Sequence, residues 1–339
     1  MRSIVLSLAL VLAASVVGAF EVEDRIRLGP DNASATLRII STADADIFEK
    51  VLQGFLAETS DLAIDYVVAS STEIMRALTV DGAIFDVAIS SAMDLQTKLA
   101  NDRLTLPHNT AQASILPEWA RWRQDLFGFT EEPAAIVLSR AAFDGLDLPE
   151  TREDLIAVLR EHPERFRGRI GTYDLRQSGL GYLFATQDSR TSEVFWRLTE
   201  VMGALDAKLY CCSGAMIDDV ASGKLAVAYN ALSSYALSRE DTAAYEVIFP
   251  SDFTTVMMRT ALIPATAANT EAASDFIDYL LRIAWSNEAG ASISDLSVDT
   301  EPFASSVKRI RIDPGLLIFL DAFKRARFVE AWENAILQN

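Results

Sequence analysis

Three short apolar runs in the first hundred residues are each followed by a pair of neighbouring hydroxyl side chains. Each pair precedes a run with apolar residues at helical spacing. The three pairs are Ser41-Thr42, Ser70-Ser71 and Ser90-Ser91. Hydroxyl groups donate and accept hydrogen bonds, so a set of them can replace the hydration shell of a polar solute. The chemistry that these residues predict is the binding of a small ligand.

Each pair also has a local explanation. Ser and Thr are favoured helix N-caps, and Ser70 and Ser91 stand three residues before Glu73 and Asp94, the spacing of a capping box. A capping hydroxyl is used by its own helix. The second hydroxyl of each pair stays free to donate outward, and three such pairs at one end of a sheet would converge on one point.

Small polar residues gather again between residues 172 and 182. This stretch contains Thr172, Tyr173, Ser178, Gly179 and Gly181. Glycine lets the backbone approach a ligand closely, and a helix from about Tyr182 would present its positive N-terminal end. No Lys follows the glycines, as a Walker loop requires, and the third glycine of a dinucleotide fingerprint is missing. An ordinary helix start remains the alternative.

Two further short strands are predicted, at 208–210 and 225–229. The polar residues at or after their ends are Ser213, Gly214, Tyr229 and Asn230. The second half of the chain thus repeats the arrangement of the first half, with small polar residues between a strand and a helix.

The elements that would position these residues alternate between strand and helix. Residues 36–40, 64–69 and 85–89 are predicted strands, each followed by a helix, and 169–173 starts a second series. This alternation predicts α/β architecture with parallel strands. Ligands of such sheets bind beyond the carboxyl ends of the strands, where helix N-termini point. We expect the chain to cross between two units near 132–138 and again within 247–263.

The composition excludes several classes of protein. The 339 residues include 30 Lys and Arg against 48 Asp and Glu, a formal charge of -18, and 50% of the residues are hydrophobic. A disordered acidic tail lacks this apolar content, a nucleic-acid-binding protein carries a basic stripe, and a disulfide scaffold has more than two cysteines. The length predicts about two domains, each with its own core.

The first nineteen residues have the pattern of a secretory signal peptide. Arg2 precedes an apolar run over 4–17, and Val17-Gly18-Ala19 is a small-residue cleavage site. The run is shorter than the roughly twenty residues that a membrane span needs. We therefore expect cleavage after Ala19 and a periplasmic location.

Taken together, these features resemble a type II periplasmic solute-binding protein of an ABC transporter, in the branch that binds ferric iron or phosphosugars. The resemblance rests on the hydroxyl-tipped strands, the Tyr173-Asp174 to Gly181-Tyr182 segment and the strand ending in Tyr229-Asn230. It implies an α/β fold with two lobes of mixed sheets on a two-strand hinge, closing over one ligand. The implied division is a signal peptide at 1–19, lobe 1 at 20–133 and 255–313, lobe 2 at 134–254, and a C-terminal helix at 314–339 packing on the lobes.

The nature of the ligand is decided by the residue types. Ferric-binding members use paired neighbouring tyrosines after the strand that here ends at Tyr229, and this pair is absent. Fe(III) favours anionic oxygen ligands, whereas neutral hydroxyls and glycines follow these strands. We expect an organic anion, a phosphorylated sugar or a carboxylate. Iron held by Tyr229 and Tyr235 is the alternative. Arg176 and Arg259 are candidate charge partners, although each also fits a surface or inter-lobe role.

Cys211 and Cys212 are neighbours and are the only cysteines. Consecutive Cα atoms lie about 3.8 Å apart, below the usual disulfide range, so we expect reduced thiols. A bond between them is the alternative, and it would stiffen the turn that presents Ser213 and Gly214.

Nothing in the sequence favours catalysis. The two histidines, His108 and His162, belong to no metal pair or Ser-His-Asp order, and no nucleophile elbow is present. The expected protein is a monomer without a cofactor or a nucleic-acid partner. Its partners would be a small anion and an ABC permease. A membrane sensor kinase in place of the permease is the alternative that the sequence leaves open.

Overall fold

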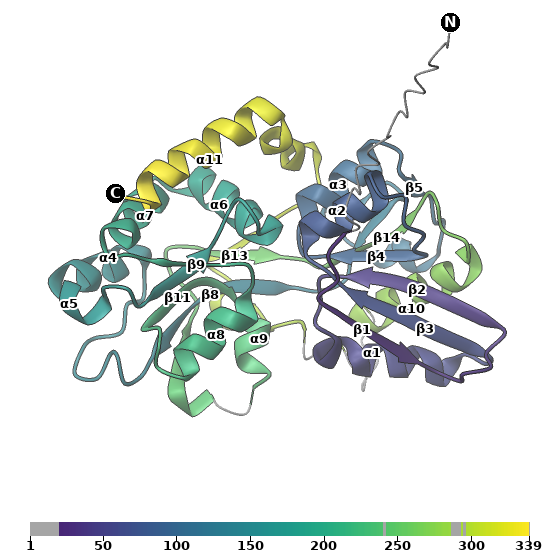
Figure 1. Ribbon diagram of the computed structural model, residues 1–339, viewed down its shortest axis with the longest axis horizontal. Coiled ribbons are helices and arrows are strands. Elements are labelled where there is room, and N and C mark those ends of the chain that lie inside the picture. Colours follow the sequence, from purple (N-terminus) through teal and green to yellow (C-terminus); the bar gives the residue numbers. More distant parts are fainter. Residues whose placement is uncertain (1–19, 240–241, 286–292, 294–295, 339) are drawn as a thin grey trace, which may run out of the picture.

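The computed structural model describes residues 20–239, 242–285, 293 and 296–338. The predicted signal peptide at 1–19 lies outside these residues. Two sheets form the centres of two lobes, which stand side by side (Figure 1). Among the described residues, no helix is long and apolar enough to cross a membrane.

The first sheet has the strand order β1-β3-β2-β4-β14-β7-β6, with β5 paired to β14. Strands β2, β3 and β4 are parallel, and β1 and β14 run antiparallel to their neighbours. The strands are β1 (Asp24–Leu28), β2 (Ala35–Ser41), β3 (Leu62–Val68), β4 (Val87–Ser90), β5 (Thr105–Leu106), β6 (Arg121–Trp122), β7 (Leu126–Gly128) and β14 (Thr260–Pro264). Every residue of β3 and β4 is buried, as expected of strands covered on both faces.

Helices cover this sheet through their apolar faces. Phe48, Val51, Leu52 and Phe55 of α1 are buried, and the Phe55 ring packs edge-on against Phe276. Each fully buried side chain of this size stabilises the fold by roughly 1.5–3 kcal/mol. The helices of this lobe are α1 (Ala45–Glu58), α2 (Ser71–Thr79), α3 (Met93–Asn101) and α10 (Thr270–Trp285), with 3-10 turns at Gln112–Ile115 and Glu118–Ala120.

The second sheet has the strand order β10-β9-β11-β8-β13-β15, with β12 paired to β8. Its strands are β8 (Glu132–Ser139), β9 (Ile170–Tyr173), β10 (Lys208–Tyr210), β11 (Val227–Leu232), β12 (Tyr245–Ile248), β13 (Thr254–Met257) and β15 (Val307–Arg309). Its helices are α4 (Arg152–Glu161), α5 (Pro163–Phe166), α6 (Gly179–Thr191), α7 (Val194–Ala204), α8 (Ser213–Ala221) and α9 (Ser233–Leu237).

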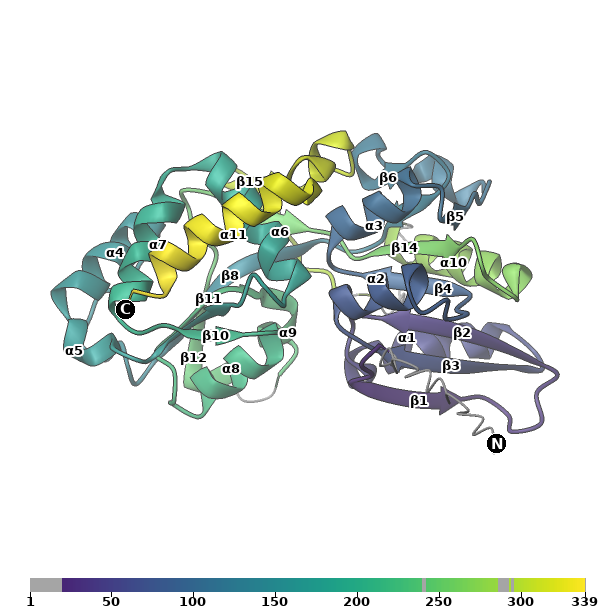
Figure 2. The ribbon, with the colours of Figure 1, turned by 45° about the horizontal axis from the view of Figure 1, so that its top comes forward.

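The C-terminal region lies along the second lobe. Helix α11 (Ala322–Ile336), in yellow, packs on α7 and is preceded by the 3-10 helix η5 (Pro314–Leu320), which contacts α3 of the first lobe (Figure 2). A further 3-10 turn covers Glu301–Phe303. Strand β15 pairs with β13, so the chain is back in the second sheet before residue 313. The predicted lobe boundaries stay a prediction.

The chain passes between the sheets after β7 and again between β13 and β14. At these crossings Arg259 and Glu132 form a buried ion pair, with 2.9 Å between Nε and Oε1. The backbone N–H of Arg259 donates to the Thr130 hydroxyl at 2.8 Å, and that hydroxyl donates to Glu132 at 2.9 Å. One polar network therefore ties the two crossing segments together.

Two local expectations differ from the structure. Helix α6 begins at Gly179 rather than near Tyr182, because the Ser178 hydroxyl accepts a hydrogen bond from the Gly181 N–H and caps it there. The capping box expected at Ser91 is wrong, since α3 begins at Met93 after Ala92 and has no side-chain cap. The Ser70 cap of α2 is confirmed by its bond from the Glu73 N–H at 3.2 Å.

Candidate functional site

A cavity of about 270 Å³ lies where the two lobes meet. The first lobe and the crossing segments contribute Glu23, Thr42, Asp44, Ala69, Ser70, Ser71, Ser91 and Arg259. The second lobe contributes Tyr173, Gln177, Ser178, Leu180, Cys211, Cys212, Ser213, Gly214, Ala215, Asp218, Leu232 and Tyr235. A larger groove of about 770 Å³ lies between α4, α7 and α11, but its lining comes from one side of the molecule. The smaller cavity is the candidate site because strand ends of both sheets meet there.

Helices α2, α6 and α8 each place a serine at the start of the helix in the wall of this cavity. Ser71 is the first residue of α2, Ser178 is the N-cap of α6, and Ser213 is the first residue of α8. The first N–H groups of a helix have no partner within it and carry a partial positive charge. The cavity wall therefore presents hydrogen-bond donors from both lobes.

The hydroxyl groups of Thr42, Ser70, Ser71 and Ser91 form a layer on the first-lobe side of the cavity. The Thr42 hydroxyl accepts a hydrogen bond from the Ser91 N–H at 3.0 Å and lies 3.3 Å from the Ser91 hydroxyl. Within the described part of the chain, the Ser71 hydroxyl has no hydrogen-bond partner. It is thus able to bond to a bound ligand.

Arg259 supplies the positive charge of the site. Its side chain is 1% exposed, and its Nη1 atom has no hydrogen-bond partner among the described residues. Burial alone would lower the pKa of Arg259. The neighbouring Glu132 and Tyr235 have the opposite and larger effect, so the pKa is raised and the guanidinium stays charged. A buried guanidinium with an unused donor leaves an unsatisfied group, and an anionic ligand would satisfy it.

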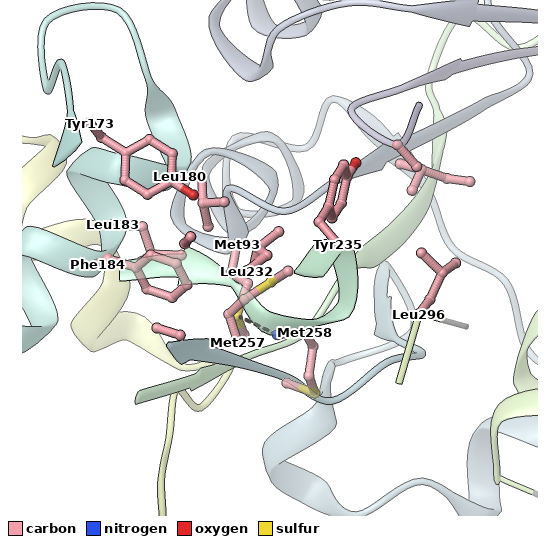
Figure 3. Packing of buried hydrophobic residues seen from close by; sticks show 14 of the residues in the cluster. Met93, Tyr173, Leu180, Leu183, Phe184, Leu232, Tyr235, Met257, Met258 and Leu296 are labelled. Carbon is pink, nitrogen blue, oxygen red and sulfur yellow. Dashed lines mark hydrogen bonds between the residues drawn. The ribbon is translucent and has the colours of Figure 1, made fainter. Parts of the chain in front are cut away.

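Tyrosine side chains stand on the second-lobe side. The Tyr173 and Ser213 hydroxyls are 2.5 Å apart, and the Ser213 hydroxyl also accepts a hydrogen bond from the Leu232 N–H at 3.0 Å. Burial raises the pKa of Tyr235 to about 12, so its hydroxyl is neutral and able to donate. Tyr173, Leu180, Leu232 and Tyr235 stand beside a core that contains Met93, Met257 and Met258, which gives the site a packed floor (Figure 3).

Many of the residues that the sequence singled out meet at this cavity. The lining contains Thr42, Ser70, Ser71, Ser91, Tyr173, Ser178, Ser213 and Gly214. Gly179 lies against the cavity wall, since a Cβ there would come within 2.3 Å of the Ser71 hydroxyl. Their part in binding remains a prediction that the structure makes geometrically reasonable.

Other predicted residues lie outside the lining. The Ser41 and Ser90 hydroxyls accept hydrogen bonds from the N–H groups of Ala43 and Ala92. Thr172 and Gly181 border a separate small cavity of about 20 Å³.

Tyr229 and Asn230 face away from the site for a backbone reason. The pairing of β11 with β8 shifts register between Ala228 and Ala231, and Asn230 has a φ of 60°. The bulge lets the Asn230 amide donate to Asp188 at 2.8 Å. The Tyr229 hydroxyl donates to Asp188 at 3.0 Å and accepts from Arg152 at 2.7 Å. Of the two tyrosines considered for iron, only Tyr235 lines the cavity.

Of the two candidate arginines, Arg176 lies elsewhere and binds Asp174 and Glu333. His108 contacts Asp278 at 2.8 Å, away from the cavity, and His162 ends α4. Among the described residues, no group of His, Cys, Asp or Glu is arranged to hold a metal ion.

The cysteines correct one expectation. The structure joins Cys211 and Cys212 in a disulfide, so the expectation of reduced thiols is wrong in this state of the molecule. Both residues line the cavity, and Cys212 is the N-cap of α8. The ring therefore occupies the position where a Ser or Asp side chain commonly caps a helix.

The residues that sequence reasoning missed are chiefly acidic. Asp44 and Glu23 line the cavity, and burial is the largest cause that raises the pKa of each carboxyl. Asp44 is the N-cap of α1. It stands two residues after Thr42, and an Asp just before a predicted helix is a signal that could have placed it at the same end of the sheet. Glu23 precedes β1, and its sequence surroundings carry no signal.

Comparisons with known proteins identify the family. A structure described as the substrate binding protein of an ABC transporter from Agrobacterium tumefaciens is 29% identical, with a TM-score of 0.84, and the match covers 92% of this chain and 98% of that one. The periplasmic binding protein AfuA from Actinobacillus pleuropneumoniae, solved with exogenous fructose-6-phosphate, is 15% identical, with a TM-score of 0.70 over 90% and 100% of the chains.

Iron-bound HitA from Pseudomonas aeruginosa is also 15% identical, with a TM-score of 0.66 over 89% and 99% of the chains. Likenesses at this level of identity establish the type II periplasmic binding protein fold, in agreement with the fold expected from the sequence. No curated protein matches the chain. The model of the family described as bacterial extracellular solute-binding protein matches residues 37–285, and the chain belongs to this family.

Proposed function

We propose that the chain is the periplasmic solute-binding component of an ABC importer and holds a small organic anion, a phosphorylated sugar or a carboxylate, between its lobes. The family match and the similarity to an ABC transporter substrate-binding protein support the transport role. The fructose-6-phosphate in AfuA is compatible with the phosphosugar class. The permease would recognise the closed, loaded form.

One observation carries the ligand class. The N-termini of α2, α6 and α8 border the same cavity as the buried Arg259, whose Nη1 has no partner within the described residues. Helix N-termini and a guanidinium both favour negative charge. The net charge of -18 does not oppose this, since it governs the long-range field while local donors govern a closed cavity.

Iron is the weaker candidate. Fe(III) needs several anionic oxygens, and Tyr229 is engaged with Arg152 and Asp188 away from the cavity. The cavity lining does contain the carboxylates of Glu23, Asp44 and Asp218, but among the described residues no group of His, Cys, Asp or Glu is arranged to hold a metal ion. The hydroxyl and N–H donors of the cavity suit an oxyanion. HitA nevertheless binds iron on the same fold, so a direct test must include Fe(III).

The first test is a thermal-shift screen of the purified mature protein against glucose 6-phosphate, fructose-6-phosphate, citrate, inorganic phosphate and Fe(III). A ligand that binds only the folded state raises the melting temperature, by an amount equivalent to about 2.7 kcal/mol at one hundred times its Kd. We expect a shift with an organic anion, confirmed by calorimetry. A shift with Fe(III) alone overturns the ligand class, and no shift with any compound counts against the whole assignment.

The second test separates binding from stability at Arg259. Replacing Arg259 with Gln leaves Glu132 buried and unpaired, a loss that typically costs 3–5 kcal/mol of stability. The double variant Arg259→Gln with Glu132→Gln removes both charges, so we expect most of the stability to return while anion affinity stays at least tenfold below wild type. Urea unfolding and calorimetry measure the two quantities. Wild-type affinity in the double variant contradicts the role given to Arg259.

A milder pair of variants tests the hydroxyl layer. Ser71→Ala removes a cavity donor and should weaken binding by roughly 1–3 kcal/mol, five- to more than one-hundredfold. Ser222→Ala removes an exposed hydroxyl at the far end of α8 and is the matched control. Equal affinity of the two variants for the anion identified in the screen counts against a ligand contact at Ser71.

A further inference from the structure

The charges around the cavity do not balance, and the imbalance is local. Arg259 is paired with Glu132 at 2.9 Å, and Asp218 is paired with Arg239 at 2.7 Å. Within the described residues, no ion pair joins Glu23 or Asp44 to a cation. Two carboxylates of the cavity lining are therefore without an ion pair in the described part of the chain.

Asp44 is held at the cleft by its backbone position. As the N-cap of α1 it follows β2, and its side chain makes no capping bond to its own helix. Its Oδ2 lies 4.0 Å from the point that a Cβ on Gly214 would occupy, so it faces the start of α8 in the other lobe. Burial raises the pKa of the Asp44 carboxyl, while Arg259 and a hydrogen bond from the Tyr235 hydroxyl oppose part of this rise. Burial and the nearby Asp44 likewise raise the pKa of Glu23.

This arrangement has a cost that a ligand can remove. Glu23 is exposed and Asp44 is half-buried in this structure, and closure of the lobes over a ligand would take both carboxylates further out of water. Removing a carboxylate from water without a compensating charge is unfavourable. A metal ion is a poor remedy, since the described residues offer no group of three ligands for one. An ammonium group donates up to three hydrogen bonds and carries the compensating charge.

A buried cation stands close to Asp44, since the Asp44 N–H and the Arg259 Nη2 each lie 3.5 Å from the Tyr235 hydroxyl oxygen. Arg259 is 1% exposed, lines the cavity and has an Nη1 without a partner in the described chain. Asp44 lines the same cavity from the start of α1. Among the described residues, one site therefore holds a buried cation with an unused donor and two acids that form no ion pair.

We propose that the ligand is amphoteric: its phosphate or carboxylate binds Arg259 and the helix N-termini, and a primary ammonium group binds Asp44 and Glu23. This inference rests on the proposed function, because it specifies the second charge of the same organic anion. The cavity of about 270 Å³ limits the ligand to a small molecule. Amino-sugar phosphates and phosphorylated amino alcohols belong to this chemical class.

Two pairs of compounds that differ only in an amine or a hydroxyl test the proposal by calorimetry. The pairs are glucosamine 6-phosphate with glucose 6-phosphate, and O-phosphoethanolamine with 2-hydroxyethyl phosphate. We expect the amine to bind at least tenfold tighter in one pair or both. If neither amine binds tighter than its hydroxyl partner, the proposal is overturned. Binding of the hydroxyl compounds in that case leaves the proposed function standing, whereas failure of all four compounds and of the earlier screen removes both.

Variants locate the ammonium contact. Asp44→Asn keeps the shape of the side chain and removes its charge, so the advantage of the amine over the hydroxyl compound should fall to less than threefold. Asp46→Asn removes an exposed charge two residues away and should leave that advantage intact. A melting temperature near wild type shows that each variant is folded. An unchanged amine advantage in Asp44→Asn, with Glu23→Gln also unchanged, overturns the assignment.

Discussion

Asp94 is a buried carboxyl that the ligand site does not use. It lies in the first turn of α3 and is 3% exposed. Burial raises its pKa to about 7, although the Leu95 N–H and Arg325 act in the opposite direction. The folded protein therefore holds a proton on Asp94 at pH values where the unfolded chain, with an ordinary pKa near 4, has released it.

The raised pKa of Asp94 makes the stability of the fold depend on pH. The folded state binds more protons than the unfolded state between about pH 4 and pH 7, so the Asp94 contribution to stability falls as pH rises through that window. Asp94→Asn should be close to neutral at pH 4 and should stabilise the protein at pH 8, by up to roughly 4 kcal/mol for a pKa of about 7. Urea unfolding of both proteins across this range measures the difference.

Asp102, at the other end of α3, is the matched control. Its hydrogen bond from Lys98 is the largest cause that lowers its pKa, so its contribution is present above the unfolded pKa and is lost as pH falls. Asp102→Asn should therefore have the opposite pH trend from Asp94→Asn. A flat difference between wild type and Asp94→Asn from pH 4 to pH 8 would show that Asp94 is not protonated in the fold.

For single side chains, the sequence could predict which strand ends carry hydroxyl donors. It could not predict which hydroxyl of a neighbouring pair faces the cavity. Thr42 and Ser91 reach the lining, while the preceding Ser41 and Ser90 bond to backbone N–H groups two residues on. Such local bonds compete with ligand contacts, and their outcome depends on the turn that follows. Asp44 was missed because the sequence was searched for hydrogen-bond donors to an anion, and a carboxylate is not such a donor.

Among the elements, the start of α8 is the least conventional. Cys212 caps the helix without a side-chain hydrogen bond, and its disulfide to Cys211 fixes the turn that presents Ser213. The sequence left this bond open as an alternative, since the usual distance rule argues against it. The start of α6 likewise depends on the Ser178 cap, and the spacing of apolar residues along the chain does not show such cap contacts.

The disulfide predicts a redox-dependent affinity. A dithiol reductant would be oxidised to its own disulfide while Cys211 and Cys212 each take up one electron and one proton as thiols. We expect reduction, or Cys211→Ser with Cys212→Ser, to weaken anion binding several-fold by loosening the N-terminus of α8, with a smaller effect on melting temperature. Intact mass after alkylation without reductant provides the control. Full alkylation of both thiols in the periplasmic protein rejects the bond, and equal affinity in both states rejects its positioning role.

At the scale of the whole molecule, the two lobes contact each other beside the cavity, and we expect this contact to control closure. Helix α6 approaches α2 and α3, and the Thr72 hydroxyl donates to the Gln177 carbonyl at 3.4 Å. The sequence could predict two α/β lobes, because strand and helix periods alternate along each half. It could not predict this contact, since the residues involved are more than one hundred positions apart and no local pattern relates them.

Gly179 is the position at which this contact can be changed with least other disturbance. It begins α6 and has no positive φ, so alanine is compatible with its backbone. An added Cβ would lie 2.3 Å from the Ser71 hydroxyl oxygen and 3.1 Å from the Ser71 Cβ. Overpacking of this kind costs roughly 1–3 kcal/mol. Because the collision exists only when α6 meets α2, this energy falls on the closed state alone.

Gly179→Ala should therefore shift the molecule toward open forms, by five- to more than one-hundredfold in the closed-to-open ratio. Small-angle scattering of the mature protein should show a larger radius of gyration than wild type, while urea unfolding should show each lobe still folded. Adding Ser71→Gly removes the two closest colliding atoms and leaves the Leu95 Cδ1 at 3.2 Å, so it should restore a radius near that of wild type. This double variant distinguishes a steric wedge from damage to α6 itself. A radius that Gly179→Ala leaves unchanged, or that Ser71→Gly fails to restore, would show that closure is limited by some other contact.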